Sequence, residues 1–402
     1  MKNRCEICKK TDLISVLKLG KHPLCDDLIK VGNKKKNKLY KIEILFCKKC
    51  VTAYQKFQVK KEILFPSSYH YRAKFTNDVI KGMKNLTNEC ENIVGNLKNK
   101  VVLDIGCNDG SLLDFFRKKK CTTVGIEPTN AYIEARRKGH AVYSNYFDSN
   151  VIRKIKKKYE TIDVITFTNV FAHIEDLQRL IINLKKLISE KTILIIENHY
   201  LGAVIERKQF DTFYHEHPRT YSFTSFFKIS KLLGMNILDC TFPKRYGGNI
   251  RVVFCRSIKQ KNNFSKLMRN ELFLFKKLLK FNGNIKIWRK NSREKILYLV
   301  KKYGPLPAKA FPGRAAILLK ILNLNEKNIK SIYEKKDSHK IGFYAPGTRI
   351  PIKSDIFLKK IDKKIPIINL AWHIKDEIKS YLHKQNIRNK ILNIVNERDF
   401  KR

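Results

Sequence analysis

Four cysteines near the start of the chain form two Cys-x-x-Cys pairs, Cys5/Cys8 and Cys47/Cys50. Four thiolates in two such pairs can occupy the corners of a tetrahedron, the geometry that Zn2+ takes in structural sites. The stretch between the pairs is longer than the about 15–20 residues of a compact zinc ribbon, and a redox-active pair or unrelated buried thiols are the alternatives. We predict a structural Zn2+ site, because four protein ligands leave no open position for water.

A second segment, residues 102–111, has the residue types of a nucleotide-binding turn. An apolar run carries Asp104 and enters a turn at Gly106, where a ligand can approach the backbone and the next helix offers amide donors. Glu127, followed by Pro128, ends the next apolar run, and a strand-end carboxylate suits the two hydroxyls of a ribose. The third glycine of the dinucleotide-binding motif is missing. An ordinary turn with a surface Glu is the alternative.

A third segment, Phe213-Tyr214-His215-Glu216-His217, packs titratable groups closely together. Such side chains suit general acid–base chemistry. A second metal site is a competing interpretation, but the spacing differs from the i, i+4 histidines of H-E-x-x-H. A third interpretation is a surface loop that happens to contain two histidines.

Strand-like and helix-like patterns alternate around these motifs. This alternation predicts a parallel α/β sheet with crossover helices. Ligands bind beyond the carboxyl ends of the strands in such sheets. The strand-like runs lie at 101–105, 122–126, 162–167, 192–197 and 250–255, and the helix-like stretches at 75–99, 111–119, 130–138 and 174–188.

The last third of the chain differs in composition and in hydrophobic pattern. Residues 259–302 are Lys-rich with a helical period, a strand–helix pattern covers 303–322, and 365–370 is strand-like. The chain has 402 residues, too many for one core, since domains usually have about 100–200. We predict three domains, at 1–72, 73–256 and 257–402.

The chain is strongly basic, with 84 Lys and Arg against 36 Asp and Glu and a formal charge of +48. Such an excess is typical of proteins that bind nucleic acid or a membrane surface. Here it is scattered along the chain with many Asn and Ile residues, as an AT-rich genome encodes by default, and we favour that explanation. No apolar run approaches the about 18–20 residues of a membrane span. Ten cysteines are too few for a disulfide scaffold, and we expect a protein of the reducing cytoplasm.

The turn at Gly106 and the strand-end Glu127 together resemble the S-adenosylmethionine (SAM) site of class I methyltransferases. Asn169 and His173 follow the next strand, at the strand end and loop where methyl transfer takes place in that fold. The resemblance implies a Rossmann-like α/β sheet with these cofactor-binding residues: Asp104, Gly106, Cys107, Asn108, Glu127, Pro128 and Asn169.

The chain as a whole resembles the SAM-dependent NDP-sugar C-methyltransferases of deoxysugar pathways, which are similar to enzymes that methylate C-3 of a 4-keto sugar. The resemblance covers nearly the whole chain, from a small N-terminal zinc domain to a C-terminal α/β domain. The segments that carry it are 17–24 beside the cysteine pairs, 68–71, 169–173, 214–217, 247–251, 303–309, 346–352 and 370–373.

The resemblance implies a mechanism. Members of this family deprotonate the carbon next to a ketone, and the enolate then attacks the SAM methyl group in line. His217 is the expected general base, a role that suits imidazole, and the enolate oxygen needs donors. The residues expected to position the sugar or stabilise the enolate are Glu216, Tyr214, His173 and Tyr71, with Tyr69 as the alternative to Tyr71.

The C-terminal domain is then expected to hold the nucleotide diphosphate. The turn at Gly304 with Lys309 is consistent with phosphate contact, although Lys302 stands where the family usually has a glycine. A solvated surface lysine is the alternative. The expected substrate-binding residues are Tyr69, Asn249, Lys309 and Arg314.

Two other functions are possible for such a chain. Zinc knuckles and a +48 charge fit an RNA methyltransferase, which would need a basic face with stacking aromatics. A non-catalytic zinc-containing scaffold is the other, and the joint presence of Asp104, Glu127 and His217 argues against it. We expect an NDP-sugar as the partner, with neither nucleic acid nor membrane, and SAM and structural Zn2+ as cofactors. No oligomeric state follows from the sequence.

Overall fold

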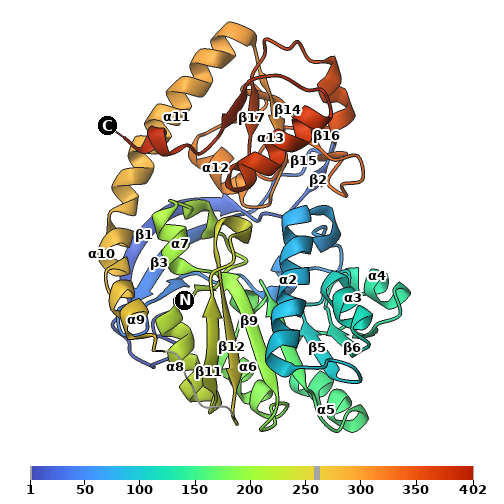
Figure 1. Ribbon diagram of the computed structural model, residues 1–402. Helices are drawn as coiled ribbons and strands as arrows, with labels where there is room; N and C mark the ends of the chain where they lie inside the picture. The colour runs from blue at the N-terminus through green and yellow to red at the C-terminus, as the bar shows by residue number, and fades with distance from the viewer. Residues whose placement is uncertain (1, 258–262, 402) are drawn as a thin grey trace. The chain divides into compact units, whose positions relative to one another are not determined.

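The computed structural model describes residues 2–257 and 263–401 (Figure 1). Its contacts divide the chain into two compact units. The first unit comprises Met1–Ile14, Leu45–Arg207 and Glu216–Phe275, and the second comprises Ser15–Ile44, Lys208–His215 and Lys276–Arg402. Three contiguous domains therefore remain a prediction. The predicted start of the Lys-rich helices at Lys259 lies outside the described residues.

A seven-stranded sheet forms the centre of the first unit, in the order β11-β12-β9-β8-β5-β6-β7. Strands β5, β6, β7, β8 and β9 run parallel, as the alternating pattern predicts. The expectation of a wholly parallel sheet is wrong for β12, which is antiparallel to β9 and β11. The reason is the short link from β11 to β12, because a parallel pair needs a crossover of a dozen or more residues. The strands are β5 Val101–Ile105, β6 Thr122–Ile126, β7 Ala141–Tyr143, β8 Val164–Thr168, β9 Ile193–His199, β11 Asn236–Thr241 and β12 Asn249–Cys255.

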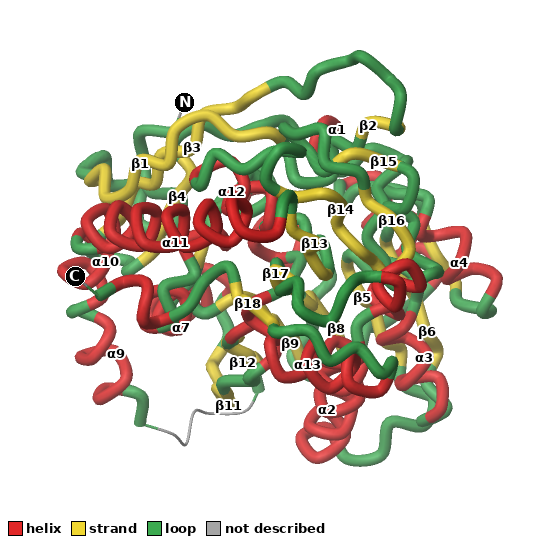
Figure 2. The backbone as a smooth tube through the Cα atoms, turned by 90° about the horizontal axis from the view of Figure 1, so that it is seen from above, coloured by secondary structure: helices red, strands yellow, loops and turns green. Residues whose placement is uncertain are grey.

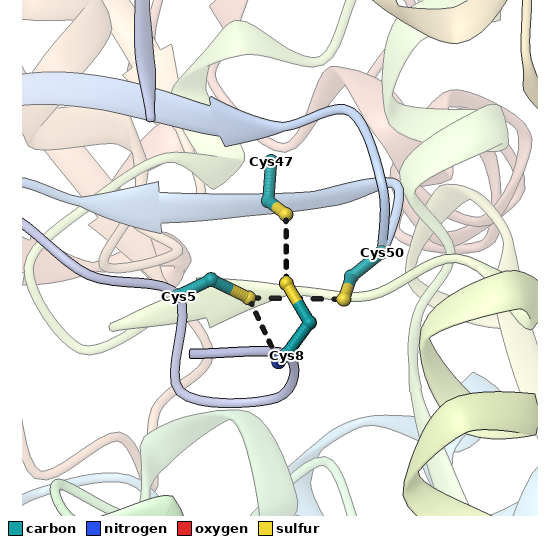
Figure 3. A group of neighbouring side chains, drawn as sticks. All are labelled: Cys5, Cys8, Cys47 and Cys50. Carbon is teal, nitrogen blue, oxygen red and sulfur yellow. Dashed lines mark hydrogen bonds between the residues drawn. The ribbon is translucent and has the colours of Figure 1, made fainter. Parts of the chain in front are cut away.

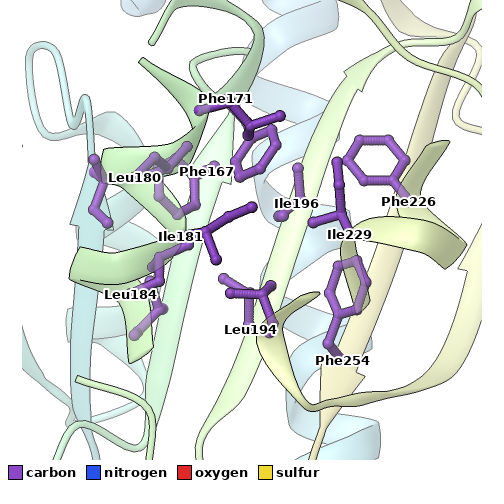
Figure 4. Packing of buried hydrophobic residues seen from close by; sticks show 14 of the residues in the cluster. Phe167, Phe171, Leu180, Ile181, Leu184, Leu194, Ile196, Phe226, Ile229 and Phe254 are labelled. Carbon is purple, nitrogen blue, oxygen red and sulfur yellow. The ribbon is translucent and has the colours of Figure 1, made fainter. Parts of the chain in front are cut away.

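Helices cover both faces of this sheet, so that the unit has three layers. Side chains alternate along the strands: Leu194 and Ile196 pack in the cluster that contains α5, α6 and α8 (Figure 4). Ile193 and Ile195 pack instead in the cluster with α2 and α3. The helices are α2 Asn77–Val94, α3 Ser111–Lys118, α4 Ala131–Arg137, α5 Ser149–Lys158, α6 Leu177–Lys185, α7 Leu201–Glu206, α8 Phe223–Leu233 and α9 Ser265–Glu271.

Local sequence fixes the ends of these helices. The Asp148 and Asp176 side chains accept hydrogen bonds from the first backbone amides of α5 and α6, as N-cap residues do. Ser222 and Ser225 form a capping box at the start of α8, and Gly234 ends that helix in the left-handed conformation.

The second cysteine pair lies between two strands, since Cys47 ends β3 and β4 begins just after Cys50. Strand β1 covers Ile14–Pro23, β3 Leu39–Cys47 and β4 Thr52–Gln55, and helix α1 covers Lys61–Leu64. Within the first unit, β4 pairs antiparallel with β10, Arg219–Thr220, so that Tyr54 lies opposite Arg219.

The second unit has its own five-stranded parallel sheet, in the order β16-β14-β13-β17-β18. The direction in which successive strands are added to the sheet changes at β13: β14 lies on one side of β13, and β17 lies on the other. The strands are β13 Leu306–Lys309, β14 Ile329–Glu334, β16 Ile352–Ser354, β17 Ile367–Asn369 and β18 Ile391–Asn393, and β2 Ile29–Lys30 pairs with β15 Phe343–Tyr344. The helices include α10 Leu274–Leu279, where the units meet in sequence, the long α11 Phe281–Tyr303, α12 Ala315–Ile321 and α13 Lys375–Lys384 (Figure 2).

No helix in the described parts of the chain combines the length and the apolarity needed to cross a membrane.

Phe226 tests the packing of the first unit. Its buried ring lies 5.1 Å from the ring of Tyr221, 6.0 Å from Phe171 and 6.4 Å from Phe254, between ring centroids. We expect Phe226→Ala to cost about 3–5 kcal/mol of unfolding free energy, because it leaves a cavity. Phe273 is 60% exposed, so Phe273→Ala is the matched control and should cost much less. Urea denaturation measures both, and equal costs would contradict this packing.

Candidate active site and metal centre

The four cysteines meet in one group, as predicted from their spacing (Figure 3). Their sulfur atoms all lie within 4.8 Å of one another, with 3.7 Å between Cys5 and Cys50 and between Cys8 and Cys47. The Tyr54 hydroxyl lies 3.1 Å from the Cys5 sulfur and can donate to a thiolate. A closed set of four sulfur donors fits a structural Zn2+ ion.

The turn after β5 is shaped to bring a ligand close to the backbone. Gly106 has a φ of 75°, and a Cβ there would lie 2.5 Å from a methyl group of Val170. Asn108 also has a positive φ, of 50°. Its amide N–H donates to Glu127 over 3.0 Å, and its side chain accepts from the amide of Ala73. The turn, the Glu127 carboxylate and the start of the short helix η1 (Ala73–Phe75) are thus tied together.

Two buried carboxylates, Asp104 and Glu127, flank this turn. Burial raises the pKa of the Asp104 carboxyl to about 7, although a 2.7 Å hydrogen bond from Thr166 acts against that rise. Burial also raises the pKa of Glu127. Glu127 accepts two hydrogen bonds from Thr129 and one from Asn108, and a carboxylate has about four acceptor sites. Burying two carboxylates costs free energy and raises their pKa values, and such perturbed pKa values are typical of functional sites.

Three histidines form a row at the carboxyl ends of β8 and β9. The His173 ring lies 5.0 Å from His217, and His217 lies 5.1 Å from His199, between ring centroids. Phe65 stacks on His173 at 5.2 Å. Burial and the neighbouring His217 hold the pKa of His173 well below its usual value, so that His173 is neutral at neutral pH.

The two tyrosines of the 69–71 segment both enter this site. The Tyr69 hydroxyl donates to the Glu216 carboxylate over 2.8 Å. The Tyr71 hydroxyl lies 2.5 Å from the hydroxyl of Tyr246, whose ring contacts His199 at 5.7 Å. Burial raises the pKa of Tyr71. Each tyrosine therefore contacts a residue next to the histidine row, and these contacts do not favour one of them over the other.

A buried ion network is centred on Glu197, two residues before His199 on β9. Glu197 pairs with Arg245 and Arg251, and all three side chains are buried. Asn249 donates to Glu197 over 2.8 Å and to the side-chain oxygen of Asn169 over 3.2 Å. The side-chain nitrogen of Asn169 is buried and has no hydrogen-bond partner among the described residues.

The remaining candidates lie in the second unit. Lys309 is buried and donates to Asp355 over 2.7 Å. Arg314 donates twice to Asp211, over 2.6 and 2.9 Å, and Trp372 donates to the same carboxylate over 3.0 Å. Both cations are therefore neutralised by carboxylates, so they can offer a substrate hydrogen bonds but little net charge.

The first three residues of the 213–217 segment also belong to the second unit: Phe213, Tyr214 and His215. His215 contacts the carbonyl oxygen of Tyr40 at 3.1 Å, and burial lowers its pKa to about 4. It is therefore a neutral structural histidine at neutral pH. The role of Tyr214 remains a prediction.

Sequence reasoning missed four residues of this site: His199, Tyr246, Glu197 and Arg245. Glu197 and His199 end β9, and the rule that ligands bind at carboxyl ends of strands could have found them. Arg245 and Tyr246 gave no local signal, because their contacts come from α2 and from the 69–71 segment.

Three family models match consecutive parts of the chain. A "Putative zinc binding domain" matches residues 5–65, a "Methyltransferase domain" matches 77–238, and a "C-methyltransferase C-terminal domain" matches 244–393.

The chain is similar to a relative along most of that protein's length. C-methyltransferase NovU of Streptomyces niveus is 23% identical over 388 residues, which are 94% of this chain and 91% of that protein.

Two solved structures resemble part of the fold. Magnesium protoporphyrin IX methyltransferase (ChlM) from Synechocystis PCC 6803, with bound SAH, is 17% identical with a TM-score of 0.35 and covers 45% of this chain and 84% of its own. The PH0226 protein from Pyrococcus horikoshii OT3 is 14% identical with a TM-score of 0.36 and covers 49% and 99%.

Zinc content tests the metal centre. We expect the purified chain to hold one Zn2+, and Cys47→Ser to lose it, because a hydroxyl is a poor replacement for a thiolate. Cys240→Ser is the matched control, since Cys240 lies outside the cluster. Elemental analysis by mass spectrometry measures the ratio, and full zinc in Cys47→Ser would contradict the site.

The pKa of Asp104 predicts an unusual dependence of stability on pH. A folded pKa of about 7 exceeds that of an unfolded Asp, so stability falls as the pH rises from about 4 to 7. Asp104→Asn lacks this dependence and should gain on the order of 3 kcal/mol relative to wild type between pH 5 and pH 8. Urea denaturation at both pH values measures it, with Asp12→Asn, at an exposed site, as control. A constant difference between wild type and Asp104→Asn would refute the raised pKa.

Proposed function

Because the chain belongs to the SAM-dependent C-methyltransferases that join zinc-binding, methyltransferase and C-terminal domains, we propose that it methylates a carbon of an NDP-4-keto-deoxysugar. A base removes the proton from the carbon next to the ketone, and the enolate attacks the methyl group in line. This reaction belongs to deoxysugar biosynthesis. The thiolate zinc ligands need reduced cysteines, which fits a reducing cytoplasm.

The histidine row carries this proposal. Its rings lie 5.0 and 5.1 Å apart, and adjacent imidazoles resist being charged together. His173 is neutral because of burial and the nearby His217. A neutral His173 beside His217 leaves no positive charge there to oppose the proton that His217 takes up as a base. We assign His217 as the base. His173 stays neutral, so it does not repel the positive charge that His217 acquires on protonation.

Hydroxyl groups beside the row are suited to the developing enolate. Tyr71 and Tyr246 share a 2.5 Å hydrogen bond, and a Tyr71 hydroxyl that accepts this bond can donate its own proton to an enolate oxygen. We assign Tyr71 to that role and Tyr214 to sugar contact. Glu216 accepts from Tyr69, and we assign it to contact with a sugar hydroxyl, because a carboxylate can accept about four hydrogen bonds.

The cofactor belongs at the turn after β5. SAM supplies a methyl group on a positively charged sulfur, ready for a carbon nucleophile. We assign the ribose hydroxyls to Glu127, and close backbone contact to Gly106, Cys107 and Asn108. The buried Asn169 nitrogen, which has no partner within residues 2–257 and 263–401, would gain one from a bound ligand. Asp104 and Pro128 border this site.

The nucleotide end of the substrate belongs to the second unit. Its parallel sheet reverses order between β13 and β17, and such switch points bind ligands in open α/β sheets. Arg314 follows β13, His373 follows β17, and each carries a buried nitrogen without a partner in the described chain. We propose that these nitrogens, with Lys309, bind the nucleotide diphosphate, and that Asn249 in the first unit contacts the sugar.

Mass spectrometry tests the reaction directly. Incubation with SAM and a panel of dTDP-, GDP- and CDP-4-keto-deoxysugars should yield one product heavier by a methyl group. In deuterated water without SAM, the same substrate should exchange the proton next to its ketone, because the base acts first. His217→Ala should lose both methyl transfer and exchange by at least about 100-fold while still binding SAM.

The matched control is His383→Ala, because His383 is exposed on α13, and it should keep both activities. Methylation of none of the sugars would contradict the substrate class. Full exchange in His217→Ala would contradict the assigned base.

A further inference from the structure

Arg219 is a completely buried arginine two residues after His217. Its guanidinium donates to the Glu6 carboxylate, to the carbonyl oxygen of Ile174 and, over 3.3 Å, to that of Glu175. Its Nε donates to the Tyr221 hydroxyl over 2.8 Å. These partners come from three separate segments of the first unit.

Each of these segments has a recognisable place in the site. Glu6 lies between the cysteines of the first Cys-x-x-Cys pair. Ile174 follows His173 directly, and Arg219 follows His217. One side chain therefore links the first zinc knuckle to both histidine segments.

The second cysteine pair reaches the same place through the backbone. Strand β4 follows Cys50 and pairs with β10, with Tyr54 opposite Arg219. The amide of Gln55 also donates to the carbonyl oxygen of Pro218 over 2.9 Å. Both zinc knuckles are thus attached to the segment that carries His217.

We infer that Arg219 is a positioning residue, which uses the zinc knuckles as a fixed support to hold His173 and His217 beside each other. The inference rests on the proposed roles of those two histidines. The planar guanidinium presents five donors in a rigid fork, and Arg219 uses this fork to hold Glu6 and two carbonyl groups at once. Lysine would present a single charged nitrogen, so it cannot hold the three segments in one geometry.

Arg219, Glu6 and the carbonyl groups of residues 174 and 175 form a clamp. Its function is to fix the distance between the rings of His173 and His217, which is 5.0 Å. Displacement of a reacting group by about 1 Å can cost about 100-fold in rate. The zinc centre would then support catalysis without contacting the substrate, through Glu6, Arg219 and the β4–β10 pair.

Arg219→Lys in the zinc-loaded full-length chain tests this role. We expect kcat to fall about 10- to 100-fold, with zinc content, SAM affinity and the KM for the sugar nucleotide little changed. Without substrate, amide hydrogen exchange in residues 171–176 and 217–222 should accelerate at least tenfold, while residues 101–110 keep their protection. Selectively labelled histidine spectra should show shifted resonances for His173 and His217 but not for His383.

Two variants at the other end of the clamp serve as checks. Glu6→Gln keeps the shape but removes the charge that Arg219 faces, and should accelerate the same two segments to a smaller extent. Lys2→Gln is the matched control, because Lys2 contacts the same carboxylate at 3.0 Å from outside the clamp. It should leave exchange and kcat unchanged.

Unchanged exchange and unchanged histidine resonances in Arg219→Lys would overturn the inference. If that variant does not fold, Glu6→Gln decides by the same measurements. Exchange and spectra require no substrate, so a wild-type chain that methylates no sugar would refute the proposed function while these readouts still test the clamp.

Discussion

The buried contact between Glu197 and the guanidinium groups of Arg245 and Arg251 is the interaction on which the active site depends. Burial alone opposes the charge on Glu197, but the two arginines hold its pKa below the usual value. Removing one member of such a network leaves a buried charge unpaired, at a cost of about 3–5 kcal/mol. The network also joins β9, β12 and α2, since Arg245 donates to the carbonyl of Val79. Gly82 makes this possible, because a Cβ there would lie 2.4 Å from Arg245.

The Glu197 network connects to two parts of the active site. Toward the cofactor turn, Asn249 carries the network to Asn169. Toward the histidine row, Arg245 precedes Tyr246, which adopts a φ of 54° and whose backbone amide donates a hydrogen bond to the Asp78 carboxylate. A non-glycine residue in this conformation is strained, and such strain often occurs at functional sites. The reversed strand β12 is what delivers these side chains, since its antiparallel pairing starts beside the carboxyl end of β9.

The sequence was most informative where a local pattern decides the structure. Apolar runs at 101–105 and 122–126 became β5 and β6 at the predicted residues, and the cysteine spacing correctly indicated the four-sulfur group. It was least informative where partners are distant. Lys309 and Arg314 looked like open cations, but buried carboxylates neutralise them. The reversal of β12 and the contacts of Tyr246 likewise depend on tertiary packing, which no periodicity encodes.

The interleaving of the two units has a practical meaning for anyone who wishes to divide this protein. The chain passes from one unit to the other after residues 14, 44, 207, 215 and 275. A single cut therefore cannot release either unit intact: a fragment that starts at 276 lacks 15–44 and 208–215, which belong to its own fold. Such distant contacts also slow folding, because each requires a long loop to close first. A ribosome must deliver the first 275 residues before the first unit can be completed, and the remainder of the chain before the second.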